Sequence, residues 1–389
     1  MPRFVLLFLS IFAPAGMSAA ADAAHRHVMA PDQAELGAQA AFDASGVLWA
    51  VHRVSGHIAV SRSADEGQSW SNAVLVTRTP EAIDAGGDAR PKIALGPKGE
   101  IYVSWTRPLA EPYTGEIRFS RSLDAGRTFS PPIVVHHDRQ VITHRFDTIA
   151  VNQDGEVFAA WIDKRDLVAS TPSAYRGAAL YYAVSSDQGA SFRGDFKVAD
   201  HCCECCRLAL VSHRDGTVTA FWRHIFDPNI RDHAIANLRP DGHAEAVQRA
   251  TFEDWRIDAC PHHGPAMAID GDGALHGVWF SGAARNHGVF YGRLSASRGD
   301  AAQRIGADSA GHAAIGATGR RIAIAWKEYR DGRTALRGLI SEDAGHTWRP
   351  SELSSAAGLS DHPSLLTHNG RFFAFWNSGE HPLAVIPFP

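Results

Sequence analysis

The chain has 389 residues, of which 38 are Lys or Arg and 42 are Asp or Glu, so its formal net charge is −4 with histidine neutral. Binding to nucleic acid requires a concentrated basic face, and this charge balance therefore argues against a nucleic-acid partner. The 21 histidines make the protein considerably more positive as the pH falls toward about 6.

The N-terminus has the layout of an export signal. Arg3 precedes an apolar run over residues 4–12, and small residues occupy positions 18–21. We therefore expect a cleaved signal peptide at residues 1–21 and a mature protein that is periplasmic or secreted. The apolar run is too short to span a bilayer and no second long apolar stretch follows, so we expect no membrane span.

A unit that recurs seven times dominates the remaining sequence. In each copy a strand-like stretch ends in an anchor residue six positions after a turn glycine, or seven positions in one copy. The anchors are His52, Trp105, Trp161, Trp222, Trp279, Trp326 and Trp376. A period of about 50 residues with strand chemistry in each unit is typical of a β-propeller. We predict an all-β fold of seven four-stranded antiparallel blades, with six blades as the alternative, in a single domain over residues 22–389.

The stretches before the anchors have the composition of buried strands. Residues 47–51, 101–105 and 322–326 are short runs rich in β-branched and aromatic side chains, and Gly and Asp turns bound them. Continuous apolar runs are expected where both faces of a strand are covered, as in the inner strands of a blade.

A second motif, Ser-x-Asp-x-Gly-x-x-Trp/Phe, follows four of the anchors. The copies begin at Ser63, Ser122, Ser185 and Ser341. We expect the Ser and Asp side chains to bond nearby backbone N–H groups and the glycine to take a positive φ. The aromatic ring then fills the space between neighbouring sheets, so the predicted role of the motif is structural.

These four motifs resemble the Asp-boxes, or BNR repeats, of the sialidase-like propeller superfamily, and the resemblance covers nearly all of the mature chain. It implies a propeller and, if the protein is an enzyme, a glycoside-directed activity. True sialidases resemble six-bladed propellers, and the Arg-Ile-Pro motif of their first blade is absent here. Tyr329 directly follows Glu328, which places a Tyr/Glu pair on opposite faces of a strand. We therefore do not expect an authentic sialidase.

The last repeat, residues 362–389, has room for three strands. The segment 25–29 could supply a fourth strand and close the ring by joining both ends of the chain in one blade. Closure removes sheet edges that would otherwise pair with other chains.

Cysteine and histidine gather in two segments, each placed just before the first strand of a repeat. Four of the five cysteines lie within residues 202–206, and the fifth is Cys260. Thiolate and imidazole together form a ligand set for Cu(I) or Zn(II). The candidate metal ligands are Cys202, Cys203, Cys205, Cys206, Cys260, His201, His262 and His263. Disulfides are an equal alternative in an exported protein, with Cys203 or Cys205 bridging to Cys260.

The two segments also resemble a subgroup of exported sialidase-like propellers with a C-x-C-C and a C-P-x-x-G-P signature. That resemblance implies that Cys203, Cys205, Cys206 and Cys260 are the core set and that Cys202 is an extra thiol.

In the other repeats, the position just before the first strand holds further charged residues and histidines. Because this position is the same in every repeat, we expect these residues and the cysteine segments to meet at one mouth of the channel. The candidate ligand-binding residues are Arg90, His144, Arg145, Arg207, His312 and His362. The simplest role of the arginines is ion pairing with Asp88, Asp147 and Asp361.

Three functions remain open. The first hypothesis is an exported propeller that binds or handles a metal ion, with copper preferred over zinc, or a small ligand at the channel mouth. The second is a glycoside hydrolase or a carbohydrate-binding propeller, with a glycan as partner. The third is an interaction scaffold held by disulfides. Free thiols in the purified protein would favour metal binding, and an acid and a base clustered at the channel would favour an enzyme. The scaffold requires neither feature.

Overall fold

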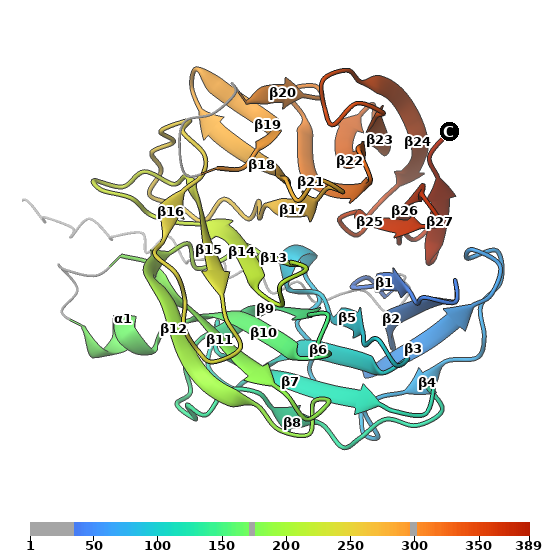
Figure 1. Cartoon of the computed structure of the whole chain (residues 1–389), viewed down its shortest axis with the longest axis vertical. Helices are drawn as coiled ribbons and strands as arrows, with labels where there is room; N and C mark the ends of the chain where they lie inside the picture. Colours follow the sequence, from blue (N-terminus) through green and yellow to red (C-terminus); the bar gives the residue numbers. More distant parts are fainter. Residues whose placement is uncertain (1–34, 171–175, 296–301) are drawn as a thin grey trace, which may run out of the picture. The chain divides into compact units, whose positions relative to one another are not determined.

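The computed structural model describes residues 35–170, 176–295 and 302–389. Its described strands form seven antiparallel sheets, numbered here as blades 1 to 7 in chain order. The protein is a seven-bladed β-propeller, as the seven anchors predict (Figure 1). The predicted signal peptide, 1–21, and the segment 25–29 lie outside the described residues.

Blades 1 to 4 each contain four strands. They are β1 (Gln39–Phe42), β2 (Leu48–Val54), β3 (His57–Ser63), β4 (Val74–Leu75), β5 (Lys92–Leu95), β6 (Ile101–Pro108), β7 (Gly115–Ser122), β8 (Ile133–Val134), β9 (His144–Val151), β10 (Val157–Asp163), β11 (Ala178–Ser185), β12 (Arg193–Cys202), β13 (Ala209–Ser212), β14 (Val218–Arg223), β15 (His233–Leu238) and β16 (Gln248–Arg249).

Blades 5 and 6 contain four strands each, and blade 7 contains three described strands. They are β17 (Ala266–Ile269), β18 (Leu275–Ala283), β19 (Asn286–Arg293), β20 (Gln303–Ile305), β21 (Ala310–Thr318), β22 (Arg321–Arg330), β23 (Arg333–Ser341), β24 (Arg349–Ala357), β25 (Ser364–His368), β26 (Arg371–Trp376) and β27 (Ala384–Pro387).

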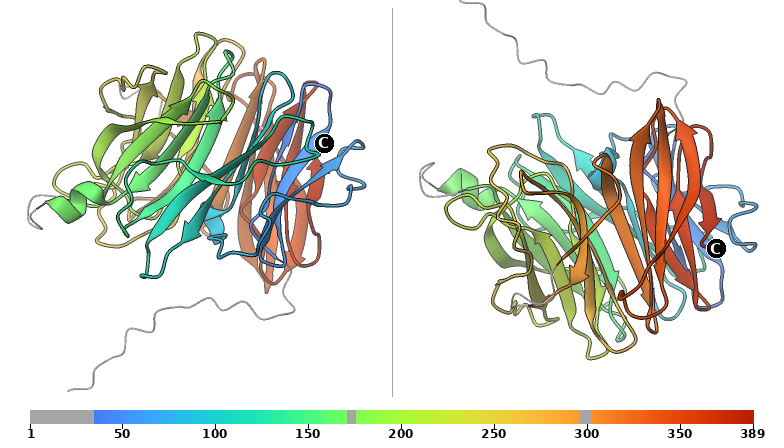
Figure 2. Two further views of the ribbon diagram at one scale, coloured as in Figure 1. Left: turned by 90° about the horizontal axis from the view of Figure 1, so that it is seen from below. Right: turned by 90° about the horizontal axis from the view of Figure 1, so that it is seen from above.

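Helices are few among the described residues: α1 (Arg165–Ala169) lies at the periphery (Figure 2), and η1 (Gly87–Ala89) is one 3₁₀ turn. Neither helix has the length and apolar character needed to cross a membrane.

The first strand of each blade contacts the first strand of the next blade, and β25 contacts β1, so the inner ring is closed. All seven anchors lie on the second strand of a blade. Trp105, Trp161, Trp222 and Trp376 are fully buried there. The core is therefore distributed between the blades, and the inner ring sets the position of every segment that leads into a first strand.

The four Ser-x-Asp-x-Gly motifs share one set of hydrogen bonds. In the copy from Ser185, the Gly189 N–H donates to Ser185 Oγ at 2.8 Å, and the Ser191 N–H donates to Asp187 Oδ1 at 3.0 Å. Gly189 has a φ of +78°. The aromatic Phe192 packs edge-on against Phe119 of the neighbouring blade, with ring centroids 4.9 Å apart. The motif therefore tightens the turn and packs two blades together.

Candidate functional site

The two cysteine segments join consecutive blades. Residues 203–208 connect β12 of blade 3 to β13 of blade 4, and residues 260–265 precede β17 of blade 5. Both segments lead directly into strands of the inner ring. They also contact each other closely, because a Cβ on Gly264 would lie 2.2 Å from Arg207 Cγ and 2.6 Å from Arg207 N.

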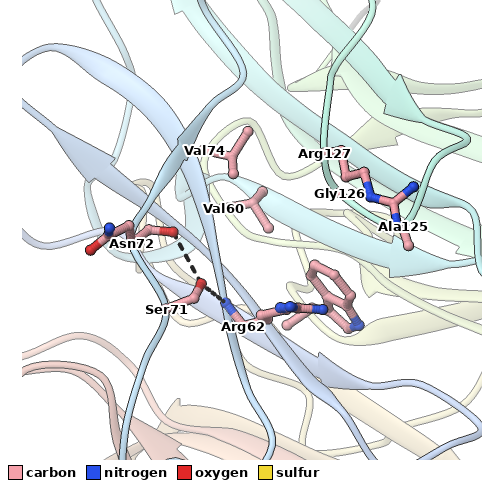
Figure 3. Close-up of a pocket in the computed structure, with 9 residues that line it drawn as sticks. Val60, Arg62, Ser71, Asn72, Val74, Ala125, Gly126 and Arg127 are labelled. Atoms are coloured by element: carbon pink, nitrogen blue, oxygen red, sulfur yellow. Dashed lines mark hydrogen bonds between the residues drawn. The ribbon is translucent and has the colours of Figure 1, made fainter.

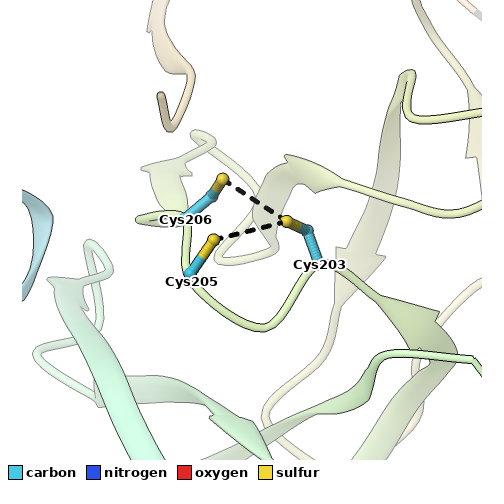
Figure 4. Close-up of side chains that lie close together, drawn as sticks. All are labelled: Cys203, Cys205 and Cys206. Carbon is cyan, nitrogen blue, oxygen red and sulfur yellow. Dashed lines mark hydrogen bonds between the residues drawn. The ribbon is translucent and has the colours of Figure 1, made fainter. Parts of the chain in front are cut away.

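Three thiols from the first segment point toward one another (Figure 4). Cys203 Sγ lies 3.8 Å from Cys205 Sγ and 3.5 Å from Cys206 Sγ, and all three residues are buried. Cys260 is exposed and lies outside this group of mutually close thiols, although the Cys205 thiol lowers its pKa. A Zn–S bond of about 2.3 Å in tetrahedral geometry places the sulfurs about 3.8 Å apart. The thiol spacing is thus close to that of a metal-thiolate centre.

The protonation of this thiol cluster, Cys203, Cys205, Cys206 and Cys260, is divided between its members. Hydrogen bonds from Cys205 and then Cys206 hold the pKa of Cys203 well below its ordinary value, and the Cys205 thiol also lowers the pKa of Cys260. The same hydrogen bonds raise the pKa values of Cys205 and Cys206.

Two arginines supply positive charge beside the thiol cluster. Arg231 Nη1 lies 3.9 Å from Cys203 Sγ. The buried Arg223 also lowers the pKa of Cys203, while its guanidinium donates to the carbonyls of Arg231, His263 and Phe280. Arg223 directly follows the anchor Trp222, and Arg231 lies in the stretch between the two cysteine segments.

Cys202 is separate from the thiol cluster. It is fully buried in the core between blades 3 and 4, where its Sγ donates to the Ala199 and Asp200 carbonyls at 3.8 and 3.7 Å. Burial raises the pKa of the Cys202 thiol.

At the cysteines, the donor atoms that lie within 4.8 Å of one another belong to Cys203, Cys205 and Cys206. The three predicted histidine ligands are outside this group. His201 Nδ1 instead accepts a hydrogen bond from the Arg176 N–H at 3.2 Å. His262 is exposed, and His263 stacks on other rings.

His263 belongs to a column of stacked rings at the channel mouth. Its ring lies 4.1 Å from Phe280 and 4.3 Å from His312, and His312 lies 3.6 Å from His362. Burial lowers the pKa of His263 to about 4 and also lowers the pKa values of His312 and His362. The three imidazoles are therefore neutral at neutral pH.

Asp88 connects this column to both cysteine segments. Its Oδ1 accepts hydrogen bonds from Arg207 Nη1 at 2.8 Å and from His362 Nδ1 at 3.0 Å. Its Oδ2 accepts from the backbone N–H groups of Arg207 at 3.2 Å and Gly264 at 2.9 Å. Although burial raises it, Arg207 and His362 hold the pKa of Asp88 well below its ordinary value. Asp88, which precedes the first strand of blade 2, is therefore a charged hub that holds the segments entering blades 4, 5 and 7.

The structure brings four of the six predicted ligand-binding residues together. Arg207, His312 and His362 surround Asp88, and Arg90 donates to the His362 carbonyl and to Ser364 Oγ at 3.1 Å. Asp88 pairs with Arg207, as expected. Asp147 accepts instead from Ser104 and Thr106, and Asp361 from the N–H groups of Gly37 and Ala38.

His144 and Arg145 lie away from this group. Arg145 pairs with Asp84, and His144 stacks on His136 with ring centroids 3.9 Å apart. The register of β9 against β10 shifts between Ala160 and Ile162, so β9 contains a bulge that a count of positions from the anchor cannot include.

Cavities lie beside these elements and along the blade rims. The axial cavity, of about 280 Å³, is lined by residues of the first strands of all seven blades and by Asp88, Arg90 and Arg207. The side pocket, of about 350 Å³, lies over blades 5 and 6 and is lined by His263, Phe280, His287, Asp308, Ser309, Ala310, Gly311, His312, Lys327, Tyr329 and Thr334. A third cavity, between blades 1 and 2, contains Arg62 and Arg127 but neither imidazole nor thiol (Figure 3).

Comparison with known proteins establishes the fold and no closer relationship. No protein-family model and no curated protein matches the chain. Among solved structures, a PL25 ulvan lyase bound to -[GlcA(1-4)Rha3S]- matches with a TM-score of 0.55 and 10% identity over 92% of this chain and 94% of that one.

Two further matches are an arabinanase and an arabinofuranosidase, each in complex with arabinobiose. The α-L-arabinanase of Penicillium chrysogenum has a TM-score of 0.53 and 14% identity over 77% of this chain and 92% of its own. The GH93 α-L-arabinofuranosidase of Fusarium graminearum has a TM-score of 0.51 and 15% identity over 79% and 96%. At these low identities, the TM-scores show that the chain shares the fold of these structures.

Proposed function

We propose that this protein binds one thiophilic metal ion through Cys203, Cys205, Cys206 and Cys260, and that the propeller is an exported holder of that ion. The observation that carries the proposal is the group of three buried thiols with sulfur separations of 3.5 and 3.8 Å around Cys203. Cys260, from the second segment, is the proposed fourth donor. Export rests on the predicted signal peptide.

The donor chemistry selects the class of metal. Soft thiolates prefer Cu(I) and Zn(II) over Mg²⁺ or Ca²⁺, and four sulfurs also satisfy the tetrahedral preference of zinc. The two cations near the cluster, Arg223 and Arg231, offset the negative charge that bound thiolates carry. Copper(I) is our first choice and zinc the second.

Serine variants test the proposal, because serine removes a sulfur donor with little change in volume. Cys203→Ser and Cys260→Ser should each lose stoichiometric copper while the circular dichroism spectrum stays that of the wild type. Cys202→Ser is the matched control, since Cys202 lies outside the thiol cluster, and it should keep the ion. Full copper retention in both cluster variants would overturn the proposal.

A carbohydrate-directed function is the second candidate, and the side pocket over blades 5 and 6 favours it. This pocket combines the aromatic rings of Phe280 and Tyr329 with His287 and Lys327, and Tyr329 is 66% exposed. Burial lowers the pKa of Lys327 to about 8. Aromatic faces beside a few polar groups suit a sugar ring, and the structures with a shared fold hold saccharides.

A screen of polysaccharides for binding and for release of sugar ends tests the carbohydrate candidate. Tyr329→Ala should weaken any binding that the screen detects, whereas exchange of an exposed aromatic residue elsewhere, Tyr113→Ala, should not. Equal losses in the two variants, or no response to any polysaccharide, would reject the side pocket as the site.

A further inference from the structure

The axial cavity has a chemical character that neither proposed function uses. It is bordered by the innermost strands of all seven blades, and its charged lining residues are Asp88, Arg90, Lys92 and Arg207. Arg207 is matched by Asp88, at 2.8 Å. The remaining two, Arg90 and Lys92, are cations.

Both remaining cations are more than nine-tenths buried, with exposed fractions of 7% for Arg90 and 6% for Lys92. Their hydrogen bonds end on neutral oxygen atoms. Arg90 donates to the His362 carbonyl and to Ser364 Oγ, and Lys92 donates to the carbonyls of Asp88 and Arg90. Within the described residues, no carboxylate lies within ion-pairing distance of either cation.

The nearby carboxylates are already engaged. Asp147 accepts hydrogen bonds from Ser104 and Thr106 at 2.6 and 3.0 Å. Asp361 accepts from two backbone N–H groups and from Asn377 Nδ2. A buried charge without a close counter-charge is costly, so the cavity wall favours any ligand that brings negative charge.

The protonation of these groups agrees with that charge balance. Burial lowers the pKa of Arg90 and lowers that of Lys92 to about 8. Burial also raises the pKa of Asp147, although Lys92 acts against the rise. An anion beside Arg90 and Lys92 would relieve the desolvation of both cations.

We propose that the axial cavity is a binding site for a small oxyanion, a carboxylate or an inorganic phosphate or sulfate, held by Arg90 and Lys92. A guanidinium presents a planar fork to a carboxylate or phosphate, and an ammonium adds a compact positive charge. Gln39, whose Oε1 accepts the Ile93 N–H at 2.9 Å, also lines the cavity and can donate its amide N–H groups to an anion. A volume of about 280 Å³ fits a small anion and not an oligosaccharide.

Thermal unfolding in different anions at constant ionic strength tests this site. Inorganic phosphate, sulfate and glucuronate are compared with chloride, so that an inorganic oxyanion and an organic carboxylate are distinguished. We expect at least one of the three to raise the midpoint in a saturable manner. The absence of any saturable rise relative to chloride would overturn the proposal.

Substitutions at Lys92 assign the response to the cavity. Lys92→Met removes a buried charge and keeps an apolar chain of similar length, so the variant should fold and need at least tenfold more anion for the same shift. Lys92→Arg keeps the charge and should keep the response. Lys98→Met, an exposed residue of the same blade, is the matched control. An unchanged response in Lys92→Met, or its loss in Lys98→Met as well, would exclude the axial site.

Discussion

The role of Asp88 as a hub can be tested by one isosteric substitution. In Asp88→Asn the new amide nitrogen cannot accept hydrogen bonds, so two of the four bonds that the carboxylate accepts are lost. The substitution also removes the only carboxylate that pairs with Arg207 among the described residues. Breaking a buried ion pair by removal of one partner costs about 3–5 kcal/mol. We expect a loss of unfolding free energy in that range.

Urea unfolding followed by tryptophan fluorescence measures this loss, since the chain contains 10 Trp residues. The matched control is Asp308→Asn, which breaks the ion pair of an exposed carboxylate with Arg304. Exposed pairs contribute about 0–1 kcal/mol, so the control should unfold almost as the wild type does. A loss below about 1 kcal/mol in Asp88→Asn would refute the hub, because two lost bonds and a buried guanidinium without its carboxylate require more.

Other expectations concern the fold outside the site. Burial lowers the pKa of His136 from 6.5 to about 3, and its Nε2 accepts the Ile117 N–H. Below about pH 6.5 the unfolded chain therefore binds a proton at His136 that the folded protein does not bind. The free energy of unfolding falls from about pH 6.5 toward about pH 3. At pH 4 the loss of unfolding free energy from this proton is about 3 kcal/mol. Urea titrations of His136→Gln should lack this loss, and the same pH dependence of stability in the variant and the wild type would contradict the assignment. Hydrogen bonds within its turn lower the pKa of Asp187 to about 2, although burial raises it. That stabilisation is present above about pH 4 and lost toward pH 2, so Asp187→Asn should reduce the fall in unfolding free energy between these pH values. An unchanged fall would contradict a stabilising role of the Asp187 carboxylate in its turn. Phe192→Ala should cost about 3–5 kcal/mol in urea, because its ring is buried against Phe119; a loss under about 1 kcal/mol would mean that the ring does not hold two blades together.

The architecture followed from the sequence because its signals are local and repeated. Each blade has its own turn glycine and its own anchor on the second strand, so an error in the predicted bounds of one blade leaves the prediction for the next blade unchanged. His52, which replaces Trp in the first repeat, still lies on the second strand of its blade. The prediction of three strands within residues 362–389 is likewise confirmed for blade 7. A fourth strand from residues 25–29 stays a prediction.

The candidate site could be predicted only in part. Because a segment before a first strand must emerge at the inner ring, the cysteine segments and Arg207 were placed near Asp88 from spacing alone. The bulge in β9 displaces His144 and Arg145, and it has no signature in the residue types. Ring stacking between His263, His312 and His362 is a tertiary contact of three blades. The sequence does not single out Lys92 as a site residue, because its burial depends on closure of the ring of blades around it.

The most direct test of the metal site measures thiols and metal in the same sample, purified from the export compartment without chelator. Our account predicts about one equivalent of copper or zinc, and five titratable thiols once the ion is removed under anaerobic conditions, in agreement with the five unpaired cysteines. The absence of metal together with a single titratable thiol would contradict it, because the thiol cluster would then be a pair of disulfides.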